Sequence, residues 1–276
     1  MAEATKVPCS PKYIFDNAAE QAGARFKALS TIYDPDTIRH LIERGVDRGW
    51  HCLEVGGGNG SIAAWLGVRV GPEGRVLVTD IDTRYLEGLE QPNIEVKSHN
   101  IVEDELPEGA FDLVHSRLVL LHLPKRDQAL GRMIAALKPG GWLVDEEFDS
   151  TSVLADTGIN SSEILPKTHF AMWHLMEDRG VERRFGRLLP GRMRAHGLTA
   201  VGAEGRLFMW EGGSPGASLT RANYEQIRAD LIGAGYLTEE EFEMDIAGLE
   251  APEFLMASPI MWTAWGQRPQ AQQAFA

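Results

Sequence analysis

Cysteine is scarce in this sequence, and Cys9 and Cys52 are the only two among 276 residues. No Cys-x-x-Cys pair and no cluster of cysteine with histidine occurs, so the sequence predicts neither a disulfide framework nor a metal site. Cys52 lies inside an apolar run, where a thiol acts as a small buried hydrophobic side chain.

Long hydrophobic runs and positive charge are also missing. No stretch reaches about 18 apolar residues, and residues 1–12 lack the apolar core of a signal peptide, so we expect a cytoplasmic protein without membrane spans. Acidic side chains number 40 against 27 basic ones, which gives a net charge of −13. This balance disfavours phosphate backbones and anionic lipid, and we expect neither nucleic acid nor a membrane as partner.

Glycine is concentrated in residues 52–61, which read Cys-Leu-Glu-Val-Gly-Gly-Gly-Asn-Gly-Ser. A short apolar run reaches Glu54, glycines follow at 56, 58 and 60, and a helix can begin at Ser61. A strand that enters a glycine turn and then a helix presents free N–H groups and a positive helix end to a ligand. Taken alone, the glycines fit an ordinary tight turn equally well.

Short apolar runs alternate with helix-like segments through residues 36–148. This alternation predicts an α/β fold with a doubly wound parallel sheet. Because right-handed crossovers bring the carboxyl ends of parallel strands to one edge, a ligand site is expected there. The expected strands are 51–55, 75–80, 94–97, 111–115 and 142–144.

The flanking segments are less regular. A helix is expected over 17–29, and Tyr33-Asp34-Pro35-Asp36 is expected to break it before a second helix begins. No internal repeat or linker divides the chain, so a single domain over 1–276 is expected. The other expected helices are 83–89, 163–178, 219–231 and 238–249, and the other expected strands are 201–210 and 258–265.

An acid follows the second expected strand. Asp80 stands about 20 residues after Gly60, where a carboxylate can accept hydrogen bonds from both hydroxyls of a ribose. Dinucleotides and S-adenosylmethionine (SAM) both carry such a ribose. The dinucleotide pattern Gly-x-Gly-x-x-Gly needs a glycine at the position of Ser61, so the spacing favours SAM.

The order Glu54-x-Gly56-x-Gly58-x-Gly60 resembles the acid-x-Gly-x-Gly-x-Gly motif of class I SAM-dependent methyltransferases. The blocks Val-Thr-Asp-Ile-Asp at 78–82, Phe-Asp-Leu-Val-His-Ser at 111–116 and Leu-Lys-Pro-Gly-Gly-Trp-Leu at 137–143 are similar to further motifs of that family. The resemblance implies SAM as cofactor and a mostly parallel, doubly wound seven-stranded sheet. It also implies an N-terminal helical cap over 1–35, a SAM-binding core over 36–148, and helical lid insertions with the last two strands over 149–276.

The same resemblance assigns cofactor-binding roles. The glycines would admit the methionine portion and the ribose, Asp80 would hold the ribose, and Ile81 would pack on adenine. Asn100 stands where the family often has an acid, and its side-chain oxygen can still accept a hydrogen bond from the adenine amino group. The residues implied are Glu54, Gly56, Gly57, Gly58, Asn59, Gly60, Asp80, Ile81, Asn100, Ile101, Ser116 and Tyr13.

Methyl transfer from a sulfonium is an in-line displacement, and a base is needed only when the nucleophile must lose a proton. The catalytic candidates are His122, in the Leu-Leu-His-Leu run at 120–123 that resembles part of the family's fourth-strand block, and Glu146 and Glu147, which are expected to follow strand five directly. The candidates for the acceptor are Arg117, His169, Trp173 and Trp210. His122 and His169 equally fit packing roles in the core.

Aromatic residues outside the core segment can wall an apolar pocket, so we expect a small, partly apolar acceptor that is methylated on O, N or C. Two alternatives remain: an NAD-dependent oxidoreductase or other SAM-using enzyme of this fold, and a non-catalytic SAM-binding protein. A homodimer is compatible with the sequence.

Overall fold

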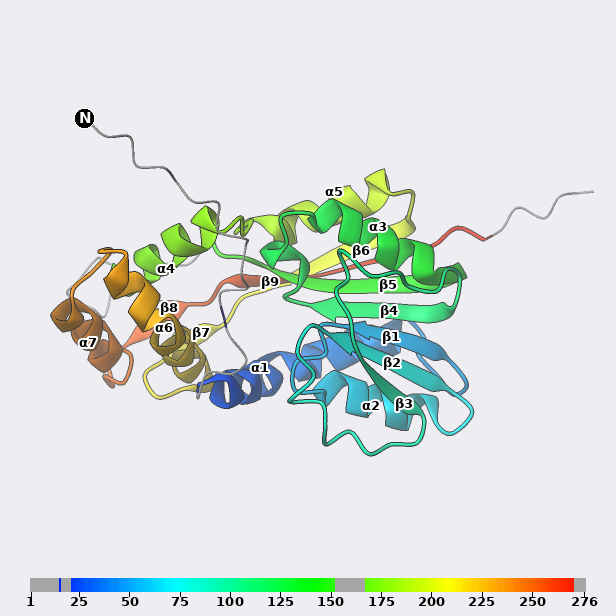
Figure 1. Ribbon diagram of the computed structural model, residues 1–276, viewed down its shortest axis with the longest axis horizontal. Helices are drawn as coiled ribbons and strands as arrows, with labels where there is room; N and C mark the ends of the chain where they lie inside the picture. Colours follow the sequence, from blue (N-terminus) through cyan, green and yellow to red (C-terminus); the bar gives the residue numbers. More distant parts are fainter. Residues whose placement is uncertain (1–14, 16–20, 152–166, 271–276) are drawn as a thin grey trace, which may run out of the picture.

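The structure is a computed structural model that describes residue 15 and residues 21–151 and 167–270. A seven-stranded sheet in the order β3-β2-β1-β4-β5-β9-β6 forms its centre (Figure 1). Strands β1 to β5 run parallel, and β9 is antiparallel to both β5 and β6. The mostly parallel seven-stranded sheet expected from the sequence is therefore confirmed. The strands are β1 (His51–Val55), β2 (Arg75–Asp80), β3 (Ile94–Ser98), β4 (Phe111–Arg117), β5 (Leu137–Asp149), β6 (Thr199–Arg206) and β9 (Ile260–Gln267).

Helices cover both faces of this sheet (Figure 1). The face with α1 and α2 buries Cys52 and Leu113, and the face with α3 and α5 buries their neighbours Leu53 and Val114. Successive strand residues point to opposite faces, so near-continuous apolar runs are what a doubly covered sheet requires. The helices are α1 (Ala22–Glu43), α2 (Ser61–Val70), α3 (Arg126–Ala136), α4 (Lys167–Asp178), α5 (Phe185–Ala195), α6 (Pro215–Gly233), α7 (Glu239–Gly248) and the short 3-10 helix η1 (Leu120–His122).

Helices α4, α6 and α7 gather beyond one end of the main sheet, beside a two-stranded sheet of β7 (Met209–Glu211) and β8 (Leu255–Ala257) (Figure 1). Helix α7 begins with a capping box, in which Thr238 and Glu241 exchange side-chain and backbone hydrogen bonds. The single strand expected over 201–210 is wrong. Pairing with β9 ends at Arg206, and the chain then turns into β7, which pairs with β8 instead.

Helix α1 is continuous where the sequence predicted a break. It runs through Pro35, although a proline inside a helix removes one hydrogen bond and costs about 3 kcal/mol. Tyr33 and Thr37, on either side of the proline, are both buried. Asp34 pairs with Arg117 at 2.8 Å. These contacts with the rest of the protein outweigh the local preference for a break.

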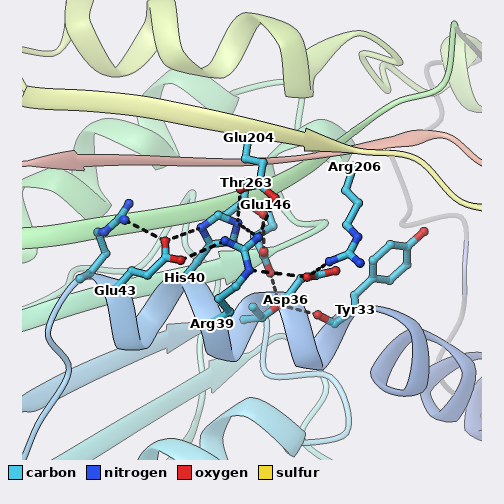
Figure 2. A network of polar contacts seen from close by, with 11 residues as sticks. Tyr33, Asp36, Arg39, His40, Glu43, Glu146, Glu204, Arg206 and Thr263 are labelled. Carbon is cyan, nitrogen blue, oxygen red and sulfur yellow. Dashed lines mark hydrogen bonds and ion pairs between the residues drawn. The ribbon is translucent and has the colours of Figure 1, made fainter.

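Polar side chains fasten α1 to the last strands of the sheet, as Figure 2 shows. Arg39 pairs with Glu204 of β6 at 2.6 Å, and Asp36 pairs with Arg206 of the same strand. Glu146 of β5 accepts a hydrogen bond from Thr263 of β9 at 2.6 Å. The C-terminal half of α1 is thereby held across the sheet, which fixes the position of its N-terminal half.

Two further expectations about the chain path are wrong. Residues 83–89 form turns rather than a helix. Strand β5 continues to Asp149, so Glu146 and Glu147 lie inside the strand, fully buried on its opposite faces, and not in a loop after it. Within the part of the chain that the structure describes, no helix has both the length and the apolar character needed to cross a membrane.

Candidate functional site

The carboxyl ends of β1, β2 and β4 meet the N-terminal half of α1 around a cavity of about 280 Å³, here called the first cavity. It lies at the sheet edge where the parallel topology predicted a ligand site. Among the described residues, neither Gly60 nor Ser116 lines this cavity, and Tyr13 lies outside the described residues. The expected cofactor-binding residues that line it are Glu54, Gly56, Gly57, Gly58, Asn59, Asp80, Ile81, Asn100 and Ile101.

The turn after β1 can be built only with glycine. Gly56 has a φ of 71°, and an added Cβ there would lie 2.3 Å from Val119 Cγ2. Gly58 has a φ of 54°, and its added Cβ would lie 3.1 Å from the ring of Phe26. The turn is therefore left-handed and closely packed on two sides, so its backbone forms part of the cavity wall.

Asp80 is tied to this turn. Its Oδ2 accepts a hydrogen bond from the Gly58 N–H at 3.0 Å, and its Oδ1 accepts one from Asp82 N–H at 3.0 Å. Burial raises the pKa of Asp80, although these backbone donors oppose the shift. Each carboxylate oxygen has a second lone pair, so Asp80 can still accept the hydroxyls of a ribose in the cavity.

The far end of the first cavity suits a flat, apolar group. Ile81 lines the cavity and is 59% exposed, which leaves an apolar surface open beside the acid. Asn100 turns its Oδ1 back to the Val102 N–H at 3.0 Å. One lone pair of that oxygen is thus used within the loop, and one remains for a ligand.

A buried ion triad lies behind the glycine turn. His115 Nδ1 is 2.6 Å from Glu54 Oε2, and its Nε2 is 3.5 Å from Glu146 Oε2. Burial by itself lowers the pKa of His115, but the two carboxylates outweigh it and raise the value to about 10. Burial likewise acts to raise the pKa of Glu146, and its hydrogen bond to His115 helps to bring it down to about 2. His115 is therefore an imidazolium between two carboxylates at neutral pH.

This triad changes the interpretation of Glu146. Its carboxylate also accepts hydrogen bonds from Thr37 of α1 and Thr263 of β9. The carboxylate points to the face of the sheet that α1 covers. It lines neither the first cavity nor the second one described below. Because a low-pKa carboxylate held by three partners is a weak base, the structure places Glu146 in a structural role instead of the catalytic one expected from the sequence.

Glu147 points to the opposite face of β5 and holds the segment that follows β4. Its Oε1 accepts hydrogen bonds from the Val119 N–H at 3.1 Å and the Leu120 N–H at 2.6 Å. Burial and the nearby Asp145 raise its pKa well above the usual value. Residue Leu118, just before these amides, has a φ of 57°, a left-handed conformation that is strained for leucine. Glu147 thus stabilises a strained turn.

A second cavity, of about 70 Å³, lies between α4, α6 and the ends of β5, β7 and β8. It brings together His169, Trp173 and Trp210, three of the residues expected to contact the acceptor. Arg117 lines the first cavity instead, where it pairs with Asp34.

The two cavities adjoin. Arg25, Leu29, Leu118 and His122 line both of them. Burial, with the charges of Arg25 and Arg126, lowers the pKa of His122 to about 3, so its ring is neutral at physiological pH. His122 was expected from the sequence, and the structure places it where the two cavities meet.

Arg25 was missed. Its guanidinium lies 5.0 Å from the ring centroid of Phe15 and 4.8 Å from that of Phe26, and it is 6% exposed. The signal was a single arginine within the apolar helical stripe of Ala22, Phe26 and Leu29. A cation at such a buried position is unfavourable unless an aromatic ring or an anion lies beside it, so this pattern indicates a partner for the guanidinium.

The fold and the first cavity together define a class I SAM-dependent methyltransferase, the class whose motifs the sequence carries. A family model described as a methyltransferase domain matches residues 22–201. The chain belongs to this methyltransferase family. SAM is the methyl donor of that class, and the glycine turn and the carboxylate of Asp80 fit it.

Named relatives agree at the level of the family. Methyltransferase str3 of Strobilurus tenacellus is 31% identical over 144 residues, which is 52% of this chain and 50% of that protein. The ubiquinone/menaquinone biosynthesis C-methyltransferase UbiE of Pseudoalteromonas translucida is 34% identical over 116 residues, 39% of this chain and 46% of that protein. The chain therefore spans about half the length of the curated relatives it matches.

A solved structure shares the fold. The phosphoethanolamine N-methyltransferase 2 of Haemonchus contortus, in complex with S-adenosyl-L-methionine, superposes with a TM-score of 0.59 over 96% of this chain and 61% of its own, at 16% identity. At this identity the similarity shows the architecture alone.

Proposed function

We propose that this protein transfers the methyl group of SAM to a small, partly apolar acceptor bound in the second cavity. The observation that carries this proposal is the junction, because Arg25, Leu29, Leu118 and His122 line both cavities. A cofactor in the first cavity and an acceptor in the second would meet at these residues. Alignment and exclusion of water supply much of the rate of such a displacement.

Different residues bind the methyl donor and the acceptor. SAM supplies an electrophilic methyl group on a sulfonium. The glycine turn and Asp80 hold the donor, and Ile81 offers an apolar surface to its ring. With a pKa of about 3 the ring of His122 is a weak base, but at the junction its Nδ1 or Nε2 can accept a hydrogen bond from a hydroxyl or amine of the acceptor and so orient it.

The chemistry of the acceptor is inferred from the side chains that line the second cavity. One named relative is a C-methyltransferase and the solved neighbour is an N-methyltransferase, so the family does not fix the methylated atom. Trp173, Trp210 and Met172 line the second cavity, which favours an acceptor with an apolar body. A cytoplasmic location, the absence of a nucleic-acid partner and a homodimer stay predictions.

Calorimetric titration of the protein with SAM, S-adenosylhomocysteine and NAD tests the donor. We expect both sulfur compounds to bind and NAD not to bind. Replacing Asp80 by alanine should weaken SAM binding by about 1–3 kcal/mol, because charge-assisted hydrogen bonds to the ribose are lost. Asp82→Ala is the matched control, since Asp82 does not line the cavity among the described residues. Binding of NAD without SAM would contradict the proposal.

A further inference from the structure

Three polar atoms in residues that line the second cavity have no hydrogen-bond partner among the described residues. They are Trp173 Nε1, Asn223 Oδ1 and the Tyr224 hydroxyl. Trp173 is 5% exposed and Tyr224 is 0% exposed, so water does not reach these side chains freely. We call these residues the polar trio.

Buried polar atoms without a hydrogen-bond partner are unusual in a folded protein. Nearly all buried polar groups in proteins are hydrogen-bonded, and leaving one unpaired costs about 1–3 kcal/mol. Trp173 comes from α4, and Asn223 and Tyr224 come from α6, which packs against it. Two different helices therefore bring unpaired donors and acceptors to one cavity. The trio includes an N–H donor, a carbonyl acceptor and a hydroxyl that can do either.

The charge of the second cavity is equally informative. No Asp or Glu is among the described residues that line it. Burial, with the charge of Arg183, lowers the pKa of His169 to about 4, so both His169 and His122 are neutral at pH 7. Arg25, which also lines the cavity, adds a positive charge. An ammonium group would therefore meet a like charge and no carboxylate in this lining, and a buried unpaired cation is strongly disfavoured.

The rest of the lining is apolar. Trp210, Phe148, Met172, Met176 and Met256 surround the trio. Aromatic rings and methionine side chains pack well against a flat apolar group. The cavity thus combines an apolar wall with a few unpaired polar atoms and no negative charge, which is the composition of a small-molecule site that selects by hydrogen bonds.

We propose that the polar trio recognises the acceptor, and that this acceptor is a ring compound without positive charge that carries a hydroxyl or carbonyl oxygen. The inference rests on the proposed function, because it takes the second cavity to be the acceptor site. Tyr224 and Trp173 donate to the oxygen of the acceptor, and Asn223 Oδ1 accepts from its hydroxyl where it has one. Cationic amines are excluded by the same cavity.

The test compares probes of one shape and different polarity. Binding of p-cresol, toluene and benzylamine is measured by ligand-observed NMR, with and without saturating S-adenosylhomocysteine. We expect p-cresol to bind most tightly and benzylamine to bind least. Tyr224→Phe and Asn223→Leu should each weaken p-cresol binding by about three- to tenfold, the worth of one hydrogen bond, and should leave toluene binding within about twofold.

Tyr236→Phe is the matched control, because its hydroxyl donates to Asp178 at 2.9 Å on the surface and lies outside the cavity. Thermal unfolding of Tyr224→Phe provides a second readout. Removing an unpaired buried hydroxyl should leave the melting temperature unchanged or raise it. A clear fall would show that the hydroxyl already has a partner, and would contradict the proposal.

The two proposals fail in different ways. Equal binding of p-cresol and toluene, tighter binding of benzylamine, or no binding of any probe would overturn the role of the trio. Calorimetry with S-adenosylhomocysteine reports on the first cavity alone. If S-adenosylhomocysteine does not bind while p-cresol binding still depends on the trio, then the proposed function fails and the assignment of a non-cationic ring compound to the second cavity stands.

Discussion

The two hydrogen bonds that Glu147 accepts from the segment after β4 lead to a specific prediction. Glu147→Ala leaves the amides of Val119 and Leu120 without their acceptor. Leu120 is fully buried, and each unpaired buried amide costs about 1–3 kcal/mol. Because the Val119 amide is less buried, we expect the variant to lose about 2–4 kcal/mol of unfolding free energy.

Glu147→Gln separates the hydrogen bonds from the charge. A glutamine oxygen can accept from both amides, and burial raises the pKa of Glu147, so the site disfavours the charged carboxylate that glutamine removes. Glutamine should therefore cost less than about 1 kcal/mol. Urea denaturation, followed by fluorescence, measures both variants against the wild type.

The same pair of variants reports on the site. Leu118 and Val119 line the first cavity, and Leu118 also lines the second. Releasing the segment lets Leu118 leave its strained left-handed conformation, so Glu147→Ala should also weaken SAM binding while Glu147→Gln should not. If glutamine were as damaging as alanine, or if alanine cost less than about 0.5 kcal/mol, the positioning role would be refuted.

The remaining predictions concern the turn, the buried carboxyls and the junction. Gly56→Ala should lower the unfolding free energy and the SAM affinity by more than Gly45→Ala, which shares the positive φ but has nothing within 4 Å of its added Cβ; equal losses would contradict the close approach to Val119. Asp145 has its pKa raised to about 7, chiefly by burial, so the folded state holds a proton that the unfolded state releases near pH 4. Stability should therefore fall as pH rises from about 4 to 7, and Asp145→Asn should flatten that part of the denaturation profile; an unchanged profile would count against the assignment. His122→Leu should slow methyl transfer by about tenfold with little change in SAM affinity, because a hydrogen bond that orients the acceptor is lost; an unchanged rate of transfer from labelled SAM would contradict this role.

Much of the core was predictable from local patterns. Glu54, the glycines after it and Asp80 at the end of the next strand lie within about 30 residues, and parallel topology places them at one edge of the sheet. The first cavity therefore follows from short-range signals. The second cavity could be predicted only in part. The sequence shows Trp173 and Trp210 as aromatic residues, but it does not show that α4 and α6 pack together.

The wrong predictions share one cause, which is that contacts between segments distant in sequence override local conformational preference. Pro35 predicts a break, yet buried Tyr33 and Thr37 keep α1 continuous. Glu146 and Glu147 were expected directly after the fifth strand, as catalytic candidates, but pairing with β9 extends β5 past both of them. His115 then becomes an ion-pair centre between Glu54 and Glu146, a relation that no spacing in the sequence indicates.

The most direct test of the central claim is a crystal structure of the protein with S-adenosylhomocysteine. We predict that the ligand binds in the first cavity, with its ribose against Asp80. Its sulfur should lie at the junction bounded by Leu118 and His122 and face the second cavity. A ligand bound elsewhere, or a sulfur that faces away from Trp173 and the second cavity, would contradict it.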